Sequence, residues 1–125
     1  MGLDMYAYKA KDFKPSKPVD FEEELPSEFQ EFFYWRKHPY MHGLMESIYR
    51  EKGGDAESFN CVPVQITEDD LERIAAHVID ETLPKTQGFF FGESSEEDRD
   101  DDIRFLSEAR EAISSGYTIW YNSWW

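Results

Sequence analysis

Apolar and polar residues alternate at the start of the chain, and this two-residue period predicts a strand over residues 3–9. Leu3, Met5 and Ala7 would face one side of a sheet, while Asp4 and the two tyrosines of this segment would face the other. The ten residues after this segment hold two prolines and three lysines and predict a loop.

Four later segments show the three- and four-residue spacing of apolar positions that predicts amphipathic helices. In the first, Ser27 and Gln30 match a capping box, the phenylalanines keep helical spacing, and Pro39 ends the helix. The second lies between Pro39 and Gly53, the third begins after Thr67 and ends at Pro84, and the fourth begins after Ser95 and ends at Gly116.

Further strands are predicted where β-branched and aromatic residues gather, over residues 59–66, 88–92 and 117–125. Pro63 would place the first of these at an edge of the sheet or at a bulge, because proline cannot donate to the ladder. The expected order is strand, two helices, strand, helix, strand, helix and strand. It predicts a single α+β domain over residues 1–125, with a four-stranded, mainly antiparallel sheet and three to four helices packed mostly on one face.

Composition supports a folded domain, because 40% of the residues are hydrophobic and 17% are aromatic, enough apolar surface to offset the entropy of ordering. The single cysteine excludes an intrachain disulfide and a thiolate cluster for zinc. No apolar run reaches the roughly 20 residues that span a bilayer, and the first residues lack a signal pattern. We therefore expect a cytoplasmic protein that needs no cofactor and does not enter a membrane.

The negative charge is unevenly distributed along the chain. The formal net charge is −14, and residues 53–125 hold 17 acidic against 5 basic residues, whereas residues 1–52 hold 10 against 8. A surface of this kind repels nucleic acid and anionic membranes and attracts basic partners. We therefore expect a partner protein with a basic surface and no direct binding of nucleic acid.

The acidic segment 93–102 is the densest part of this charge, with seven acids and one arginine. It is either a solvated helix start or an acidic surface that occupies a basic groove on another protein. The candidate partner-binding residues in it are Glu96, Glu97, Asp98, Asp100, Asp101 and Asp102. A calcium loop is a further alternative, since three of the aspartates have its spacing, but Ile103 stands where that loop needs glycine.

His38, His42 and Glu46 are spaced by four residues and would share one face of a continuous helix, as paired histidines do when they hold a metal ion. Pro39 interrupts such a helix, which favours a structural role for His38 at the end of the preceding one. These three residues are the metal candidates, and a small metal-dependent enzyme built on them is an alternative function.

Cys61 could act as a nucleophile only if the fold placed His42 or His77 beside it as a base. Its position in an apolar strand favours an inert, buried thiol. The sequence contains no glycine-rich phosphate loop, nucleotide fingerprint or Gly-x-Ser-x-Gly elbow, so we expect a binding protein rather than an enzyme.

The last six residues carry three of the four tryptophans. Alternation along the predicted strand separates Trp124 from Trp125, so one of the two faces away from the core. Tryptophans dominate interface hot spots, which makes Trp124 and Trp125 a second set of partner-binding candidates. Self-association through this aromatic strand is therefore another alternative function, that of a structural or scaffold protein.

Three short motifs carry a resemblance to known proteins: residues 1–6 (Met-Gly-Leu-Asp-Met-Tyr), residues 34–38 (Tyr-Trp-Arg-Lys-His) with His42 shortly after, and residues 88–92 (Gly-Phe-Phe-Phe-Gly). Over nearly its whole length the chain resembles a family of small uncharacterised proteins of bacteriophages and prophages. The family has no established activity, so the resemblance carries over no catalytic residue. Its members tend to place tyrosines after the last motif, whereas this chain is acidic there.

The resemblance implies a setting in the cytoplasm of a bacterial host. With the acidity and the lack of catalytic motifs, it favours a non-enzymatic phage accessory protein that binds a host protein. Inhibition of a nucleic-acid-handling or defence complex would suit an acidic surface, because carboxylates can stand in for phosphates against lysine and arginine.

Overall fold

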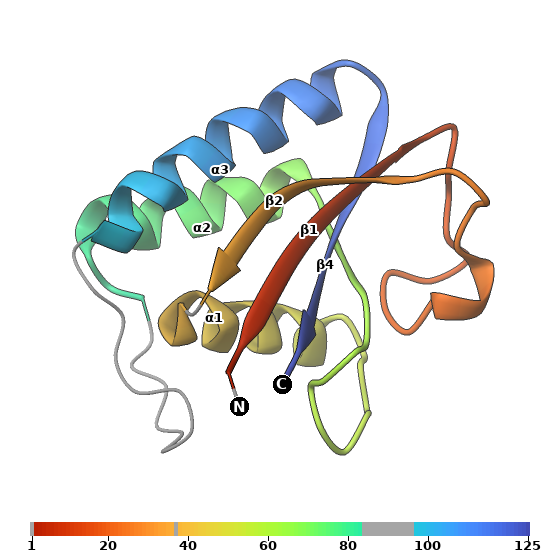
Figure 1. The fold of residues 1–125 in the computed structure, drawn as a ribbon, viewed down its shortest axis with the longest axis horizontal. Coiled ribbons are helices and arrows are strands. Elements are labelled where there is room, and N and C mark those ends of the chain that lie inside the picture. The colour runs from red at the N-terminus through yellow and green to blue at the C-terminus, as the bar shows by residue number, and fades with distance from the viewer. Residues whose placement is uncertain (1, 37, 84–96) are drawn as a thin grey trace.

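The computed structural model describes residues 2–36, 38–83 and 97–125. Within them, four strands and three helices surround one main core (Figure 1). In chain order they are β1 (Asp4–Lys11), β2 (Gln30–Arg36), α1 (Pro39–Glu51), β3 (Val64–Ile66), α2 (Glu68–Asp80), α3 (Glu97–Ser114) and β4 (Tyr117–Trp124). A short 3-10 helix, Glu22–Glu24, lies in the segment between β1 and β2.

The sheet has the strand order β2-β1-β4-β3, and every neighbouring pair is antiparallel. The first and last strands therefore lie at its centre, and Asp4 pairs with Trp124. This arrangement confirms the predicted α+β fold with a four-stranded antiparallel sheet. It also brings the start of β1 and the end of β4 side by side (Figure 1).

All three helices pack on one face of the sheet (Figure 1). Leu3, Met5 and Ala7 point to this face, as their alternation predicts, together with Ile119 and Tyr121 of β4. The helices contribute the other half of the core, with Met41, Leu44, Met45 and Ile48 from α1, Leu71, Ile74 and Val78 from α2, and Phe105, Leu106 and Ala109 from α3.

A second, smaller cluster lies on the opposite face of the sheet. Phe13 and Phe21, from the segment between β1 and β2, pack on Trp120 of β4, with ring centroids 5.5 and 6.0 Å from the indole. This segment covers only one end of that face, because the cluster includes Ala10 but neither Tyr6 nor Tyr34.

The predicted helix between Ser27 and Pro39 is wrong, because this segment forms strand β2. The register between β1 and β2 shifts between Ala7 and Tyr8, so Phe32 has no partner of its own on β1. Such a bulge places two consecutive residues on nearly the same face. Phe32 and Phe33 both reach the helix side of the sheet, so these consecutive phenylalanines break the two-residue alternation that would have predicted a strand.

Two other predicted strands differ from the structure. The strand predicted over 59–66 shortens to Val64–Ile66, directly after Pro63, and it does lie at an edge of the sheet. The strand predicted over 88–92 lies outside the described residues.

The predicted starts of α1 and α2 are explained by their local chemistry. Pro39 occupies the first turn of α1, where its missing N–H costs no hydrogen bond. Thr67 and Asp70 form the full capping box of α2, since each side chain accepts a hydrogen bond from the other residue's backbone N–H. The helices therefore begin where the sequence places them, and the core faces follow.

Candidate functional site

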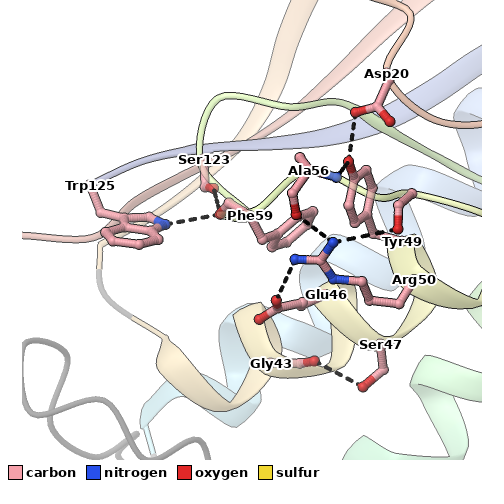
Figure 2. Close-up of polar contacts among 11 residues, drawn as sticks. Asp20, Gly43, Glu46, Ser47, Tyr49, Arg50, Ala56, Phe59, Ser123 and Trp125 are labelled. Carbon is pink, nitrogen blue, oxygen red and sulfur yellow. Dashed lines mark hydrogen bonds and ion pairs between the residues drawn. The ribbon is translucent and has the colours of Figure 1, made fainter.

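The predicted metal ligands do not come together. His38 precedes α1 rather than ending a helix, and its Nε2 lies 2.7 Å from Oδ2 of Asp102. His42 Nδ1 lies 2.7 Å from the hydroxyl of Tyr121, and Glu46 pairs with Arg50 at 3.2 Å (Figure 2). No group of three or more histidine, cysteine, aspartate or glutamate side chains within the described ranges is arranged to hold a metal ion.

His38 and Asp102 instead form a buried polar contact that joins α1 to α3. Both side chains are almost fully buried, and the indole Nε1–H of Trp35 donates to the other carboxylate oxygen at 3.3 Å. Asp102 was expected on an exposed acidic surface, and its burial corrects that expectation. A buried carboxylate needs such partners, because taking an unpaired charge out of water costs several kcal/mol.

His42 and Tyr121 form a second buried polar contact, between α1 and β4. Burial lowers the pKa of His42 to about 4 and raises the pKa of Tyr121, so both groups are neutral at pH 7. The ring of Phe59 lies 5.0 Å from the imidazole and closes the site. This pair packs within the core, and the hydrogen bond between the two side chains satisfies their buried polar groups.

The Cys61 thiol lies 3.5 Å from the side-chain oxygen of Asn60. It lies exposed in a turn with φ of 61°, rather than buried in a strand as predicted. The two histidines that were candidates for its base contact other residues, since His42 contacts Tyr121 and His77 contacts Thr82. Partial desolvation raises the pKa of the thiol, which lowers its thiolate fraction.

The acidic segment is less uniform in space than in sequence. Glu96 lies outside the described residues, and Glu97 and Asp98 begin α3. The predicted calcium-loop spacing falls on this helix, which lacks the loop that such a site needs. Asp100 and Asp101 lie at the surface, with Arg99 before them and Arg104 after them in the helix. Arg104 contacts Asp101 at 3.5 Å, and Arg99 contacts Glu81, at the end of α2, at 4.0 Å.

A more uniform negative surface lies on α2, which sequence reasoning missed. We call Glu68, Asp69, Glu72 and Asp80 the acidic stripe. All four are exposed, and none forms an ion pair with any residue of the described chain. Their spacing places them on the outward face of the helix, beside Ile79, which is 64% exposed. The amphipathic pattern of α2 predicts this surface, because the four acids occupy helix positions outside its apolar face.

The face of the sheet turned away from the helices carries a group of partly exposed aromatic side chains. We call this surface the open face, and it consists of Asp4, Tyr6, Tyr8, Phe29, Glu31, Tyr34, Arg36, Asn122 and Trp124. Strand register builds it in rows, with Tyr6 between Tyr34 and Asn122, and Asp4 between Arg36 and Trp124. Trp124 is 65% exposed and Tyr34 is 43% exposed, as is Phe29.

The tyrosines of the open face touch one another in a ladder. The ring of Tyr6 lies 5.9 Å from that of Tyr8, nearly parallel, and 5.3 Å from that of Tyr34. Phe29 meets Tyr8 edge-on at 5.5 Å, and Tyr8 stacks on Trp120 at 5.8 Å. Because the rings brace one another on three strands, this surface is preformed, which lowers the entropy lost on binding.

The electrostatic environment of the ladder is negative. The Tyr34 hydroxyl donates to Asp4 at 2.5 Å, and this hydrogen bond is the main cause that raises the pKa of Tyr34 to about 12. The pKa of Tyr6 is raised by burial and by Asp4 and Glu31, and that of Tyr8 by burial and Glu31. Arg36 lies 3.8 Å from Asp4 at the edge of this surface.

The two terminal tryptophans have different roles. Trp125 is held at the end of β4, since its indole N–H donates to the carbonyl of Phe59 at 3.0 Å (Figure 2) and its backbone N–H donates to the Asn60 side chain at 3.0 Å. Ser123 also donates to the Phe59 carbonyl, at 3.5 Å. Trp124 points to the open face and is the more exposed of the two predicted contact residues, at 65% against 37% for Trp125.

Comparisons with family models, with curated proteins and with solved structures find no match to this chain. No helix within the described part of the chain is long and apolar enough to cross a membrane. The open face and the acidic stripe are therefore the features from which a function can be proposed.

Proposed function

We propose that this chain is a non-catalytic binding module that docks on a basic protein through the open face. The observation that carries the proposal is an exposed aromatic ladder, with Trp124 beside it, on a protein of net charge −14. Exposed aromatic clusters of this kind mark interaction sites, because they bury large apolar area with few rotatable bonds. The negative charge favours encounter with a basic partner.

The resemblance to phage and prophage proteins supports a host bacterial protein as the partner and the host cytoplasm as the place of binding. Blocking a nucleic-acid-handling or defence complex fits this chemistry, because such complexes present basic surfaces. The acidic stripe then attracts the partner at long range, and the open face makes the contact.

Self-association is a second possibility that the same surface allows. β4 lies between β1 and β3 in the sheet, so self-association through this strand would use its side chains rather than extend the sheet. A self-associating protein would instead bury the open face. Light scattering distinguishes the two, because a monomer at every concentration leaves the face to another partner.

The test compares three proteins expressed in bacteria with the same tag: the native chain, the Trp124→Ala, Tyr34→Ala double variant, and Ile79→Ala. Ile79 is the matched control, since it is an exposed apolar residue on α2, away from the open face. We expect a captured basic protein, once purified, to bind the native chain and the control equally. The double variant should bind at least about tenfold more weakly. Equal affinity for all three proteins would contradict the proposal.

A further inference from the structure

The open face offers hydrogen-bond donors that the fold leaves unused. The indole N–H of Trp124 and the hydroxyls of Tyr6 and Tyr8 form no hydrogen bond with any residue the structure describes. These donors stand among ring faces rather than among backbone groups. A ligand suited to this surface therefore presents carbonyl acceptors and flat apolar groups, and requires few acceptors in return.

A proline-rich segment in the polyproline II conformation has this chemistry. Its carbonyls project outward, its prolines have no N–H to satisfy, and their rings stack on aromatic side chains. Because it is already extended, such a segment loses little entropy on binding. A strand ligand, by contrast, would need the backbone of a sheet edge, which the open face does not present.

The spacing of the strands matches the repeat of such a ligand. Tyr34 and Trp124 lie on β2 and β4, which flank β1 on either side, so their strands are two inter-strand spacings apart, about 9.6 Å. One turn of polyproline II advances about 9.3 Å over three residues. The residues that share one row across these strands are Tyr34 and Asn122, so a segment that crosses the strands places successive turns on them, with Tyr6 between them and Trp124 one row further along β4.

The charge of the surface adds a preference for a cation in the ligand. Glu31 lies opposite Tyr8 and forms no ion pair within the described residues, whereas Asp4 already has Arg36 and Tyr34 as partners. Burial is the main cause that raises the pKa of Tyr6 and Tyr8, and the carboxylates that add to it, Asp4 and Glu31, also favour a cation over the rings. Arginine suits this position best, since its planar group both stacks on a ring and pairs with a carboxylate.

Resting on the binding function proposed above, we infer that the open face binds an extended, proline-rich segment of the partner protein, with an arginine of that segment placed against Glu31. The prolines contact Tyr34 and Tyr6, and the segment crosses β4 at Asn122, beside Trp124. The segment lies across the strands and not along the sheet edge.

The test uses a capped nonapeptide of one arginine followed by eight prolines, titrated into the native chain and followed by the indole N–H resonances in NMR. We expect a saturable shift of the Trp124 resonance, assigned by its loss in Trp124→Phe. Affinity should fall at least about tenfold in Tyr34→Ala and stay unchanged in Ile79→Ala. Glu31→Gln should weaken this peptide severalfold, yet leave the binding of an uncharged nonaproline unchanged.

The uncharged nonaproline and one further control peptide decide whether proline or charge is recognised. A glycine-serine peptide with the same arginine should bind at least about tenfold more weakly, because it lacks the rings and the preformed backbone. Equal binding of that peptide, or no saturable shift with the proline peptide, would overturn the inference. The proposed function is judged separately: a protein partner that releases the Trp124→Ala, Tyr34→Ala variant supports it even if the proline peptide fails.

Discussion

At the scale of single residues, three polar side chains that the sequence marks as candidates for function have structural roles. His38, His42 and Asp102 are buried, and each has a hydrogen-bonded partner. Spacing along the chain could not reveal this, because their partners lie 64 to 79 positions away. Alternation predicts that one of Trp124 and Trp125 faces away from the core but does not say which, and the helical spacing of the phenylalanines predicts a helix at Tyr34, where the structure has a strand.

His42 should make stability depend on pH. Burial lowers its pKa to about 4, against an ordinary value of 6.5, so the unfolded chain takes up this proton first as the pH falls. The stabilising contribution is therefore complete above pH 6.5 and is lost as the pH falls towards 4, by up to about 3 kcal/mol. Urea unfolding at pH 7.5 and 4.5 should show that the native chain loses about 2 kcal/mol more than His42→Leu. Equal losses in the two proteins would refute this assignment.

Asp100 and Asp102 offer a matched comparison of an exposed and a buried carboxylate on the same helix. Asp102→Ala removes the partner of both His38 and Trp35, and we expect it to lower the free energy of unfolding by about 3 kcal/mol. Asp100→Ala should change it by less than about 0.5 kcal/mol, because its side chain is exposed. Chemical denaturation measures both, and similar small effects would mean that the buried pair contributes little.

At the scale of elements, α1, α2, α3, β1 and β4 were predictable because their apolar periods are regular and their caps are local. β2 was not, because its bulge is a property of its pairing with β1 and not of its own sequence. The order of the strands was equally hidden, since it depends on which apolar faces find one another. The chain's fold class was predictable even though one strand had been assigned as a helix.

Hydrogen exchange should show β2 as an edge strand. Only β1 neighbours it, so amides that point towards β1 should exchange slowly and those that point outward should exchange freely. We expect alternate protection between Gln30 and Arg36, with a break at Phe32, and ratios of about 100-fold or more between neighbours. Contiguous protection, as expected for the interior of α1, would instead indicate a helix.

At the scale of the whole molecule, the sheet and the helices present different chemistry to solvent. The open face is aromatic, whereas the outward face of α2 carries the acidic stripe. In the proposed function, contact with the partner and long-range attraction therefore belong to different layers of the fold. Their contributions to binding can be separated by kinetics, since anchors mainly control dissociation and distant charges mainly control association.

Charge reversal in the acidic stripe should slow association without speeding dissociation. For Asp69→Lys, Glu72→Lys, we expect an association rate with the basic partner about two- to fivefold lower at low salt and a weaker salt dependence. Trp124→Ala should mainly raise the dissociation rate. Surface plasmon resonance at several salt concentrations measures both rates. Faster dissociation in the charge variant would show that α2 itself contacts the partner.

The central position of β4 also governs how the chain must fold. β4 follows the other three described strands in the chain, yet it joins β1 to β3, so the sheet is discontinuous until β4 has been synthesised. Pairing β1 with β4 closes a loop of more than 100 residues, and such distant contacts slow folding. During synthesis, β1 and β2 would therefore leave the ribosome before β4 is made. Their apolar face would stay exposed in that interval, and it could bind chaperones or aggregate before the sheet is complete.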